Sequence, residues 1–195
     1  MKTTLIFATN NQHKVEEIRY VIGEQFKIIT LQEAGIDIDI PEPHATLEAN
    51  ATEKSQTIYR LTHQNCFSED TGLEVDALNG EPGVKSARYA GNGRNFQDNI
   101  DKLLHNLQGI TNRKARFRTV ISLVLEDKEY LFEGSCEGDI ITEQKGIQGF
   151  GYDPVFIPTG AGISFAEMTM AQKTTYSHRQ KAVAKLIHFL NHQNV

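Results

Sequence analysis

Cys-Phe-Ser-Glu-Asp-Thr-Gly-Leu, residues 66–73, is the most informative stretch of this sequence. A short apolar run ends in two adjacent carboxylates, Glu69 and Asp70, and a hydroxyl residue and a glycine follow, which is typical of a strand that ends in a turn. Carboxylates at the end of a strand are well placed to hold a hard cation or to accept a proton from water. Because an ordinary acidic turn accounts for most such pairs, this motif alone does not identify a site.

The composition is that of a globular protein. Of the 195 residues, 39% are hydrophobic and 23% are charged, so we expect a single domain over residues 1–195. No apolar run approaches the roughly 20 residues that span a bilayer, and the run at residues 5–8 is too short for a signal peptide. We therefore expect a cytoplasmic protein that binds no membrane. Cys66 and Cys136 lack motif spacing and fit reduced, partly buried thiols.

The net charge of −5 argues against a surface that binds a nucleic-acid polymer. The one basic cluster is Arg-Lys-Ala-Arg-Phe-Arg at residues 113–118. A nucleic-acid patch is one interpretation of this cluster. The other is a solvated loop that leads into a strand with alternating exposed arginines, and the shortness of the run favours it.

Hydrophobic periodicity predicts the order of the elements. We expect strands at residues 3–8, 26–31, 65–68, 73–75, 117–125 and 130–141, and helices at about 15–22, 46–61, 100–107 and 182–190. This order, β-α-β-α-β followed by a β-rich stretch and a helix, predicts an α/β protein. The expected architecture is an elongated mixed β-sheet flanked by helices, with two lobes and the active-site cleft between them.

The first candidate segment follows the first predicted strand and becomes the N-terminus of a helix. Free backbone N–H groups and the helix dipole favour a phosphate there. The segment is not a Walker loop, because its glycines are missing. In the alternative interpretation Asn11 is only an N-cap and Lys14 is solvated, and this segment alone does not decide between the two. The candidate phosphate-binding residues are Thr9, Asn10, Asn11, Gln12, His13 and Lys14.

The second candidate segment combines Glu42, in the rigid Pro-Glu-Pro linker, with the predicted helix at 46–61 and the acidic motif. Asn50 and Lys54 are four residues apart and share one helical face. Magnesium is usually held by one or two carboxylates together with substrate phosphates, and Glu42 and Asp70 are suitable carboxylates. A second carboxylate nearby can polarise the attacking water. Taken alone, Lys54 is more simply interpreted as a surface lysine.

The third candidate segment contains Phe-Gly-Tyr-Asp-Pro at residues 150–154 and Ser-His-Arg at residues 177–179. The two aromatic residues are suited to stacking on a base, and Asp153 to accepting from a base N–H. Ser177 has the capping-box spacing to Gln180, which predicts that the last helix begins there. An ordinary exposed histidine is the simpler interpretation of His178 in isolation.

Seven blocks occur in order between residues 9 and 179: Thr9-x-Asn11-x-x-Lys14, Glu42, Asn50-Ala51 with Lys54, Glu69 to Leu73, Pro82-Gly83 with Ser86 to Tyr89, Phe150 to Pro154, and Ser177 to Arg179. Together they resemble the inosine triphosphate pyrophosphatase family, whose members hydrolyse non-standard purine nucleoside triphosphates. Ser86 to Tyr89 resembles the bacterial branch, in which aspartate is usual where this chain has Glu69. The difference leaves open whether Glu69 touches the metal.

The resemblance implies hydrolysis of dITP, ITP and XTP to the nucleoside monophosphate and pyrophosphate, with Mg²⁺ as cofactor and a homodimer as the assembly. It also implies a role for each matching residue. Asp70 is the implied general base and, with Glu42, a metal ligand. The phosphate-binding residues are those of the first segment, Lys54 and Thr71. The residues implied to surround the base and sugar are Phe150, Gly151, Tyr152, Asp153, Lys173, His178 and Arg179.

Selectivity has a physical rationale in this reading. Hypoxanthine and xanthine carry an acceptor oxygen where adenine carries an amino donor, so donors from His178 or Arg179 favour the oxygen. One unpaired buried group costs about 1–3 kcal/mol, roughly tenfold to a hundredfold in discrimination. The alternative from another class is a non-catalytic nucleotide sensor on the same fold. The presence of both Glu42 and Asp70 argues against it, because a sensor needs no water-activating carboxylate.

Overall fold

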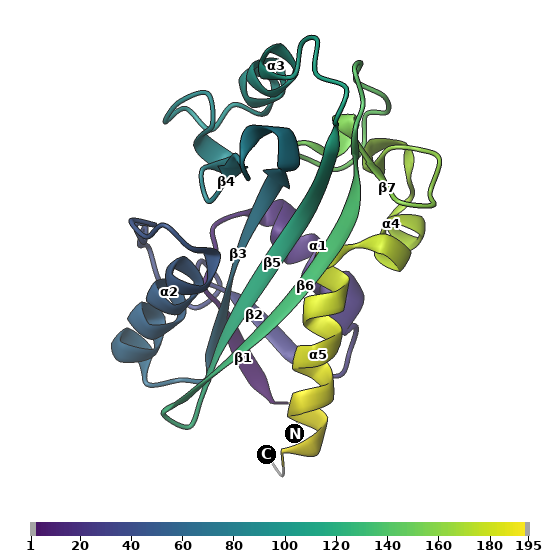
Figure 1. The fold of residues 1–195 in the computed structure, drawn as a ribbon. Helices are drawn as coiled ribbons and strands as arrows, with labels where there is room; N and C mark the ends of the chain where they lie inside the picture. The colour runs from purple at the N-terminus through teal and green to yellow at the C-terminus, as the bar shows by residue number, and fades with distance from the viewer. Residues whose placement is uncertain (1–2, 194–195) are drawn as a thin grey trace. The chain divides into compact units, whose positions relative to one another are not determined.

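The computed structural model describes residues 3–193 and shows an α/β fold (Figure 1). The strands form one mixed sheet in the order β2-β1-β3-β5-β6-β7, and β4 pairs with β3. Five α-helices flank this sheet in the described part of the chain. The predicted α/β class with a mixed sheet and flanking helices is therefore confirmed. The chain divides into two compact units, which we describe separately: unit 1 comprises residues 1–70, 119–134 and 179–195, and unit 2 comprises residues 71–118 and 135–178.

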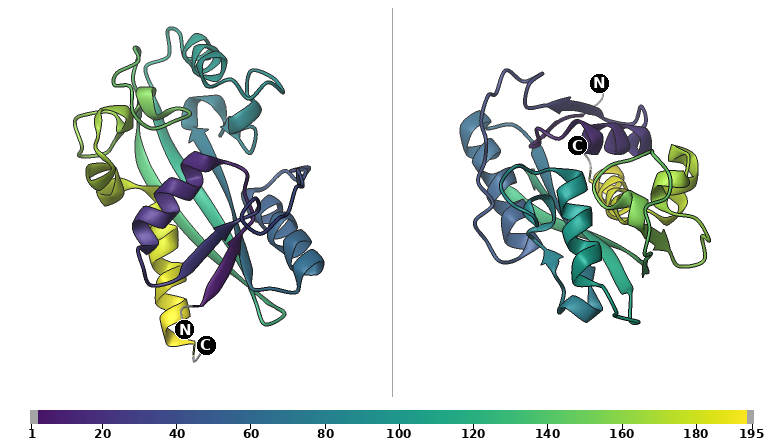
Figure 2. Two further views of the ribbon diagram at one scale, coloured as in Figure 1. Left: turned by 180° about the vertical axis from the view of Figure 1, so that it is seen from behind. Right: turned by 90° about the horizontal axis from the view of Figure 1, so that it is seen from above.

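Unit 1 begins with two parallel strands joined by a helix. β1 (Thr4–Phe7) pairs with β2 (Lys27–Thr30) and with the start of β3 (Cys66–Val75), in both cases in parallel. The connections are α1 (Gln12–Ile22) and α2 (Leu47–Thr62), and α5 (His178–His192) ends the chain. Within this unit α1 and α5 lie on one side of the strands and α2 on the other (Figure 2).

The two faces of the unit 1 sheet follow from the alternation of side chains along each strand. Leu5 and Phe7 point into a hydrophobic cluster with α1 and α5, and Ile6 points into the cluster on the α2 side. Further along the sheet, Phe67 belongs to the first cluster and Cys66 to the second. Each strand is therefore apolar on both faces, as expected for a strand covered by helices on both sides.

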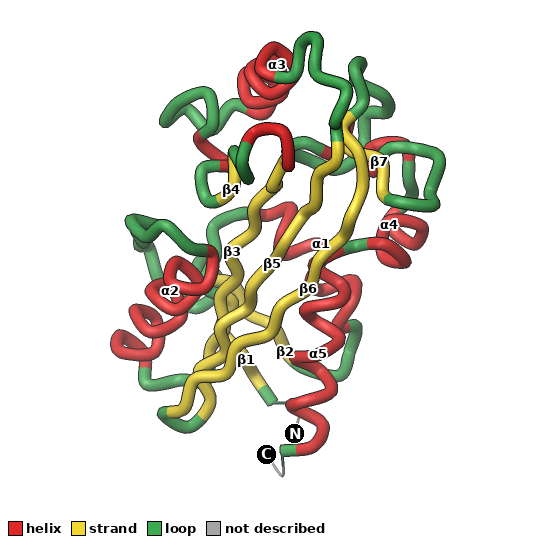
Figure 3. The backbone as a smooth tube through the Cα atoms, in the orientation of Figure 1, coloured by secondary structure: helices red, strands yellow, loops and turns green. Residues whose placement is uncertain are grey.

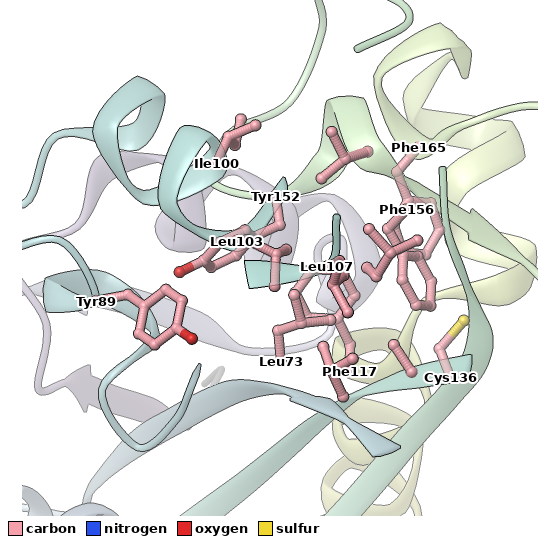
Figure 4. Packing of buried hydrophobic residues seen from close by; sticks show 14 of the residues in the cluster. Leu73, Tyr89, Ile100, Leu103, Leu107, Phe117, Cys136, Tyr152, Phe156 and Phe165 are labelled. Atoms are coloured by element: carbon pink, nitrogen blue, oxygen red, sulfur yellow. The ribbon is translucent and has the colours of Figure 1, made fainter. Parts of the chain in front are cut away.

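Unit 2 is built on the other parts of β3, of β5 (Lys114–Leu125) and of β6 (Lys128–Ile140). It adds β4 (Pro82–Gly83), α3 (Phe96–Asn106), β7 (Phe156–Pro158) and α4 (Met170–Tyr176). Its aromatic core is shown in Figure 4, where Phe117, Phe156 and Phe165 cluster near Leu107. Most of the remaining length of this unit is loop or short helix, drawn green and red in Figure 3. These short elements lacked a periodicity long enough to predict.

The acidic motif does not end a strand, and this prediction was wrong. β3 runs without interruption from Cys66 to Val75, through both carboxylates and through Gly72. A Cβ atom on Gly72 would lie 2.6 Å from the Gly83 carbonyl oxygen, so glycine is required here by the close approach of β4. The pattern indicated a turn because two adjacent charges are rarely buried within a strand.

The β5–β6 hairpin was predicted, with its turn one residue too late. Glu126 and Asp127 form the turn, with φ of 49° and 65°, the two positive values that a tight hairpin turn requires. Aspartate tolerates this conformation better than most residues, and the sequence signal was therefore real but shifted. No helix in residues 3–193 is long and apolar enough to cross a membrane.

Candidate active site

Polar side chains from four elements of unit 1 meet at β3. Glu69 and Asp70 are adjacent in a continuous strand, so their side chains point to opposite faces of the sheet. Glu69 lies on the face covered by α1 and α5, where it contacts Lys14 and Arg179. Asp70 lies on the α2 face, where it contacts Lys54. The two carboxylates therefore pair with two different groups of side chains, one on each face of the sheet.

The α1 face holds a buried ion network. Arg179, 2% exposed, donates through Nε to Glu69 Oε2 (2.7 Å) and through Nη2 to Glu69 Oε1 (2.9 Å). Its Nη1 donates to Glu17, the third residue after Lys14 in α1. Lys14 Nζ lies 3.1 Å from Glu69 Oε1. The network fixes α1, β3 and α5 to one another through charge-assisted hydrogen bonds.

The charges in this network reinforce one another. Burial by itself would raise the pKa of Glu69, but the charges of Arg179 and Lys14 outweigh it and hold the pKa well below its ordinary value. Burial acts to lower the pKa of Arg179, and Glu69 and Glu17 together raise it instead. Glu69 and Arg179 are therefore both ionised at neutral pH.

The N-terminus of α1 has the predicted form. Asn11 is the N-cap, and its side chain accepts from the Lys14 N–H (3.4 Å), while the Thr9 hydroxyl accepts from the Asn11 N–H (3.2 Å). The Asn10 side chain donates to the Ile38 carbonyl (3.0 Å) and so ties this turn to the loop after β2. No acidic residue lies in the first turn of α1, which leaves the positive end of the helix dipole suitable for an anion.

The α2 face holds the second group, in which one ammonium joins two carboxylates. Lys54 Nζ lies 2.7 Å from Glu42 Oε1 and 3.4 Å from Asp70 Oδ1. Lys54 is therefore not the surface lysine of the simpler interpretation, since only 7% of it is exposed. Lys54 is one helical turn after Asn50, as the spacing predicted, and both are buried.

Only one of the two carboxylate oxygens of Asp70 has a hydrogen-bond partner. Its Oδ2 is buried and has no hydrogen-bond partner. Burial raises the pKa of Asp70 above its ordinary value, although the charges of Lys54 and Lys14 act in the opposite direction. A buried carboxylate oxygen without a donor is costly, and such groups mark positions that accept a cation or a proton.

Asn50 positions the segment that carries Glu42. Its Oδ1 accepts from the His44 N–H (2.9 Å), and its Nδ2 donates to the His44 carbonyl (3.2 Å). A side-chain amide that pairs with both backbone groups of one residue fixes that residue's position and orientation. The linker at residues 41–46, which has no regular secondary structure, is thereby held against α2. The sequence placed Asn50 on the correct face but did not show what it binds.

Unit 2 contains the residues predicted to surround the base except Arg179, which belongs to unit 1. Asp153 is buried and accepts from Lys173 Nζ (2.6 Å) and from the Phe150 N–H (2.9 Å), both at Oδ2. A Cβ atom on Gly149 would lie 2.0 Å from this oxygen, so the Gly-Phe-Gly turn is shaped around the carboxylate. The Lys173 ammonium also lies 5.4 Å from the centre of the Phe150 ring and 5.2 Å from that of Phe165.

The aromatic residues of this segment differ in their surroundings. The His178 ring is buried and stacks on Phe117, with centroids 4.8 Å apart and planes 15° apart. Tyr152 lies in the core of unit 2, and its hydroxyl donates to the Ser86 carbonyl (2.8 Å). Phe150 is only partly buried. Of the two predicted base-stacking rings, Phe150 is therefore the one accessible to a ligand.

The other sequence predictions have mixed outcomes. α5 begins at His178, directly after Ser177, as the Ser-His-Arg block predicted. In the basic cluster, Arg116 and Arg118 pair with Glu74 at 2.7 and 3.2 Å, and Arg113 donates to three backbone carbonyls. The cluster is thus mainly a strand with paired arginines.

Glu17 was missed as a site residue, although its spacing of three from Lys14 placed both on one helical face.

Residues 3–193 contain no group of three or more His, Cys, Asp or Glu side chains that could hold a metal ion by themselves. Glu42 and Asp70 nevertheless fit Mg²⁺, which usually takes one or two carboxylates and completes its shell with water and substrate phosphate. The unpaired Asp70 Oδ2 is one ligand atom already in place. The oxygens of Glu69, by contrast, are engaged by Arg179 and Lys14.

The fold is that of an α/β protein, and these side chains form a candidate site for an anionic ligand and a hard cation. Comparison with known proteins identifies the family: residues 5–189 match the Ham1 family, and this chain belongs to it. The dITP/XTP pyrophosphatase of Porphyromonas gingivalis is 50% identical over 187 residues, which cover 95% of this chain and 96% of that protein. The one from Flavobacterium psychrophilum is 48% identical over 185 residues, covering 95% and 97%.

Solved structures agree with this assignment. The structure of the Staphylococcus aureus Ham1 protein superposes with a TM-score of 0.88 at 37% identity and covers 97% of this chain and 98% of that chain. The dITP/XTP pyrophosphatase of Mycobacterium abscessus superposes with a TM-score of 0.77 at 35% identity, covering 95% and 99%. The resemblance to pyrophosphatases that the seven sequence blocks suggested is therefore confirmed.

Proposed function

We propose that this protein hydrolyses non-canonical purine nucleoside triphosphates, dITP, ITP and XTP, to the nucleoside monophosphate and pyrophosphate. Relatives that match over 95% of the chain are dITP/XTP pyrophosphatases. The single structural observation that supports the chemistry best is Asp70, a buried carboxylate with one unpaired oxygen beside Lys54 and Glu42. Its raised pKa makes it a better proton acceptor than an exposed aspartate.

In the proposed reaction, water attacks the α-phosphorus and the bond to the pyrophosphate oxygen breaks. Asp70 accepts the water proton, and the hydroxyl becomes part of the monophosphate. Glu42 and Asp70 would hold Mg²⁺, which would supply charge neutralisation at the phosphate oxygens. Lys14, Lys54 and the α1 N-terminus, with Thr9 and Asn11, bind the phosphates and position them for attack.

The residues predicted around the base are proposed to recognise it. Phe150 offers a partly exposed ring, and Asp153 and Lys173 form a buried acceptor–donor pair directly beneath its turn. His178 and Arg179 are proposed to favour a base with an oxygen at position 6 over adenine. Guanine shares this oxygen, and its rejection is proposed to come from the lack of an acceptor for its 2-amino group. Because Glu69 and Glu17 hold the Arg179 guanidinium, its contribution is proposed to depend on that network.

The assembly and location are also proposals. We propose a homodimer in the cytoplasm, where nucleotide pools are made and used, and the two lobes with a cleft between them stay a prediction. A nucleotide sensor is the alternative function, and no observation in unit 1 favours it.

The test is pyrophosphate release from dITP, ITP, XTP, dATP and dGTP, each with and without Mg²⁺. We expect stoichiometric pyrophosphate from the first three only, and only with the metal. Release of orthophosphate, or equal rates on dATP and dITP, would contradict the proposed reaction. Tight nucleotide binding without turnover would instead support the sensor.

A further inference from the structure

The Lys54 ammonium occupies a position that the proposed function gives to a metal ion. It lies within 2.7 Å of Glu42 Oε1 and 3.4 Å of Asp70 Oδ1, and the side chains of Lys54 and Asp70 are each less than 10% exposed. These are the two carboxylates proposed to bind Mg²⁺. In the structure, both carboxylates share the single positive charge of Lys54.

An ammonium and Mg²⁺ compete for such oxygens. Mg²⁺ binds carboxylate oxygens at 2.0–2.1 Å and requires near-octahedral geometry, whereas the ammonium sits at hydrogen-bond distance from the same atoms. Two cations at one pair of poorly solvated carboxylates repel each other strongly. Asp70 Oδ2 remains open, but one oxygen is too little to hold the ion. Free metal must therefore displace Lys54 to bind well.

A bound triphosphate changes the competition between the Lys54 ammonium and Mg²⁺ for these carboxylates. Its oxygens give the displaced ammonium a new partner, and they supply the ligands that Mg²⁺ needs besides protein carboxylates. The lysine side chain has a flexible four-carbon stem with three donors at its end, so it can move from carboxylate to phosphate without movement of α2.

We propose that Lys54 is an internal counter-ion that excludes free divalent metal from Glu42 and Asp70 and releases them only to a metal-bound polyphosphate. This inference rests on the proposed function, and it adds that metal and triphosphate bind together, coupled through Lys54. Loss of Lys54 therefore has two opposite effects. The protein binds bare metal more tightly, and it binds the metal–triphosphate complex more weakly.

The experiment measures Mn²⁺ binding to the nucleotide-free protein by electron paramagnetic resonance, and Mg²⁺ binding by calorimetry. Lys54→Met removes the charge and keeps the length of the side chain. The matched control is Lys14→Met, which removes an equal charge from the same unit, where the ammonium lies on Glu69 rather than on Glu42 or Asp70. We expect the metal Kd of Lys54→Met to fall by roughly tenfold or more, the equivalent of one charge-assisted contact. The metal Kd of Lys14→Met should change by less than about threefold.

The second experiment measures the affinity for Mg²⁺ together with a non-hydrolysable dITP analogue. This affinity should weaken in both variants.

Unchanged or weaker metal binding by Lys54→Met would overturn the proposal, and so would equal tightening in Lys14→Met, which would indicate a general charge effect. If Lys54→Met is unstable, Lys54→Gln replaces it, and the rise in Tm caused by Mg²⁺ alone becomes the readout, with a larger rise than in wild type expected. A smaller or equal rise would contradict the proposal. If wild type hydrolyses dITP but neither Lys54 variant gains metal affinity, the inference fails and the proposed function stands. If a Lys54 variant gains affinity but wild type hydrolyses no triphosphate, the proposed function fails instead.

Discussion

Two neighbouring carboxylates of β3 have opposite electrostatic surroundings. Glu69 and Asp70 are both buried carboxylates, yet their pKa values are shifted in opposite directions. Glu69 is stabilised as an anion by Arg179 and Lys14, whereas Asp70 is only partly compensated by Lys54. A carboxylate kept under-compensated is suited to chemistry, and a fully paired one is suited to holding elements together.

Asp70→Asn should lower kcat by roughly 10²–10⁴-fold, because the amide cannot accept the water proton, and should raise the Tm at neutral pH. The folded-state pKa of Asp70 lies above its unfolded value, so the ionised carboxylate destabilises the fold above that pKa. The gain in Tm should shrink as the pH falls and wild-type Asp70 becomes protonated. Thermal unfolding between pH 4 and 8 tests this, and a variant with wild-type turnover would contradict the catalytic role.

Glu69→Gln should destabilise the protein strongly, because it leaves the buried Arg179 with Glu17 as its remaining carboxylate and the partly buried Lys14 beside a neutral side chain. Breaking a buried pair costs about 3–5 kcal/mol, a fall in Tm of roughly 6–20 °C for a chain of this size. The control is Glu74→Gln in the same strand, whose partners Arg116 and Arg118 are more exposed. That change should cost about 1 kcal/mol or less. Similar Tm losses in both variants would show that the buried network adds no special stability.

At the scale of elements, α2 holds both its own site residue and a neighbouring loop. Lys54 lies near the middle of the helix, and Asn50, one turn earlier, binds the backbone of His44 two residues after Glu42. The helix start itself depends on Thr46, whose hydroxyl accepts from the Ala49 N–H (3.2 Å). Thr46 thus stabilises the start of the helix, whereas Asn50 holds the segment that carries Glu42.

Asn50→Ala should raise the KM for the magnesium complex of dITP by about tenfold, since the loss of two hydrogen bonds of about 0.5–1.5 kcal/mol each releases the loop that carries Glu42. Thr46→Ala is the matched control: it should cost about 1 kcal/mol of stability through the lost N-cap and leave KM within about twofold. Steady-state kinetics and thermal unfolding of both variants separate the two effects. An equal rise in KM would mean that Asn50 acts only through helix stability.

At the scale of the whole molecule, the two units share three strands. β3, β5 and β6 each contribute residues to both units. Each unit has one buried cysteine outside any disulfide, Cys66 in unit 1 and Cys136 in unit 2. Burial raises the pKa of Cys66 to about 12, so native Cys66 is almost wholly protonated and unreactive at neutral pH. Neither cysteine forms a disulfide, and both are fully buried rather than partly buried as the sequence suggested.

The shared strands predict one cooperative unfolding transition, which also tests the expected single domain. Two single-cysteine variants report on the two units. Cys136→Ser keeps Cys66 and reports on unit 1, and Cys66→Ser keeps Cys136 and reports on unit 2. Under increasing urea, both thiols should become reactive toward a disulfide reagent at the same midpoint, coincident with loss of circular dichroism. Labelling of one thiol at a clearly lower urea concentration would show that its unit unfolds separately.

The sequence by itself determined the class of the fold, the main strands and helices, and the identity of nearly all residues that meet at β3. Apolar periodicity is local, so the run at residues 4–7 and the helix after Asn11 could be predicted without a structure. The seven blocks likewise predicted the family, because order and spacing along a chain are properties of the sequence.

Only the tertiary structure decided which charged side chains pair with one another. Glu69 and Asp70 are neighbours in sequence and looked like one acidic turn, but burial beside Arg179 and Lys54 allows a continuous strand there. Side chains alternate along a strand, so the two carboxylates face different helices. Pairing across 110 residues, as between Glu69 and Arg179, depends on how helices pack on a sheet, and no local pattern records it.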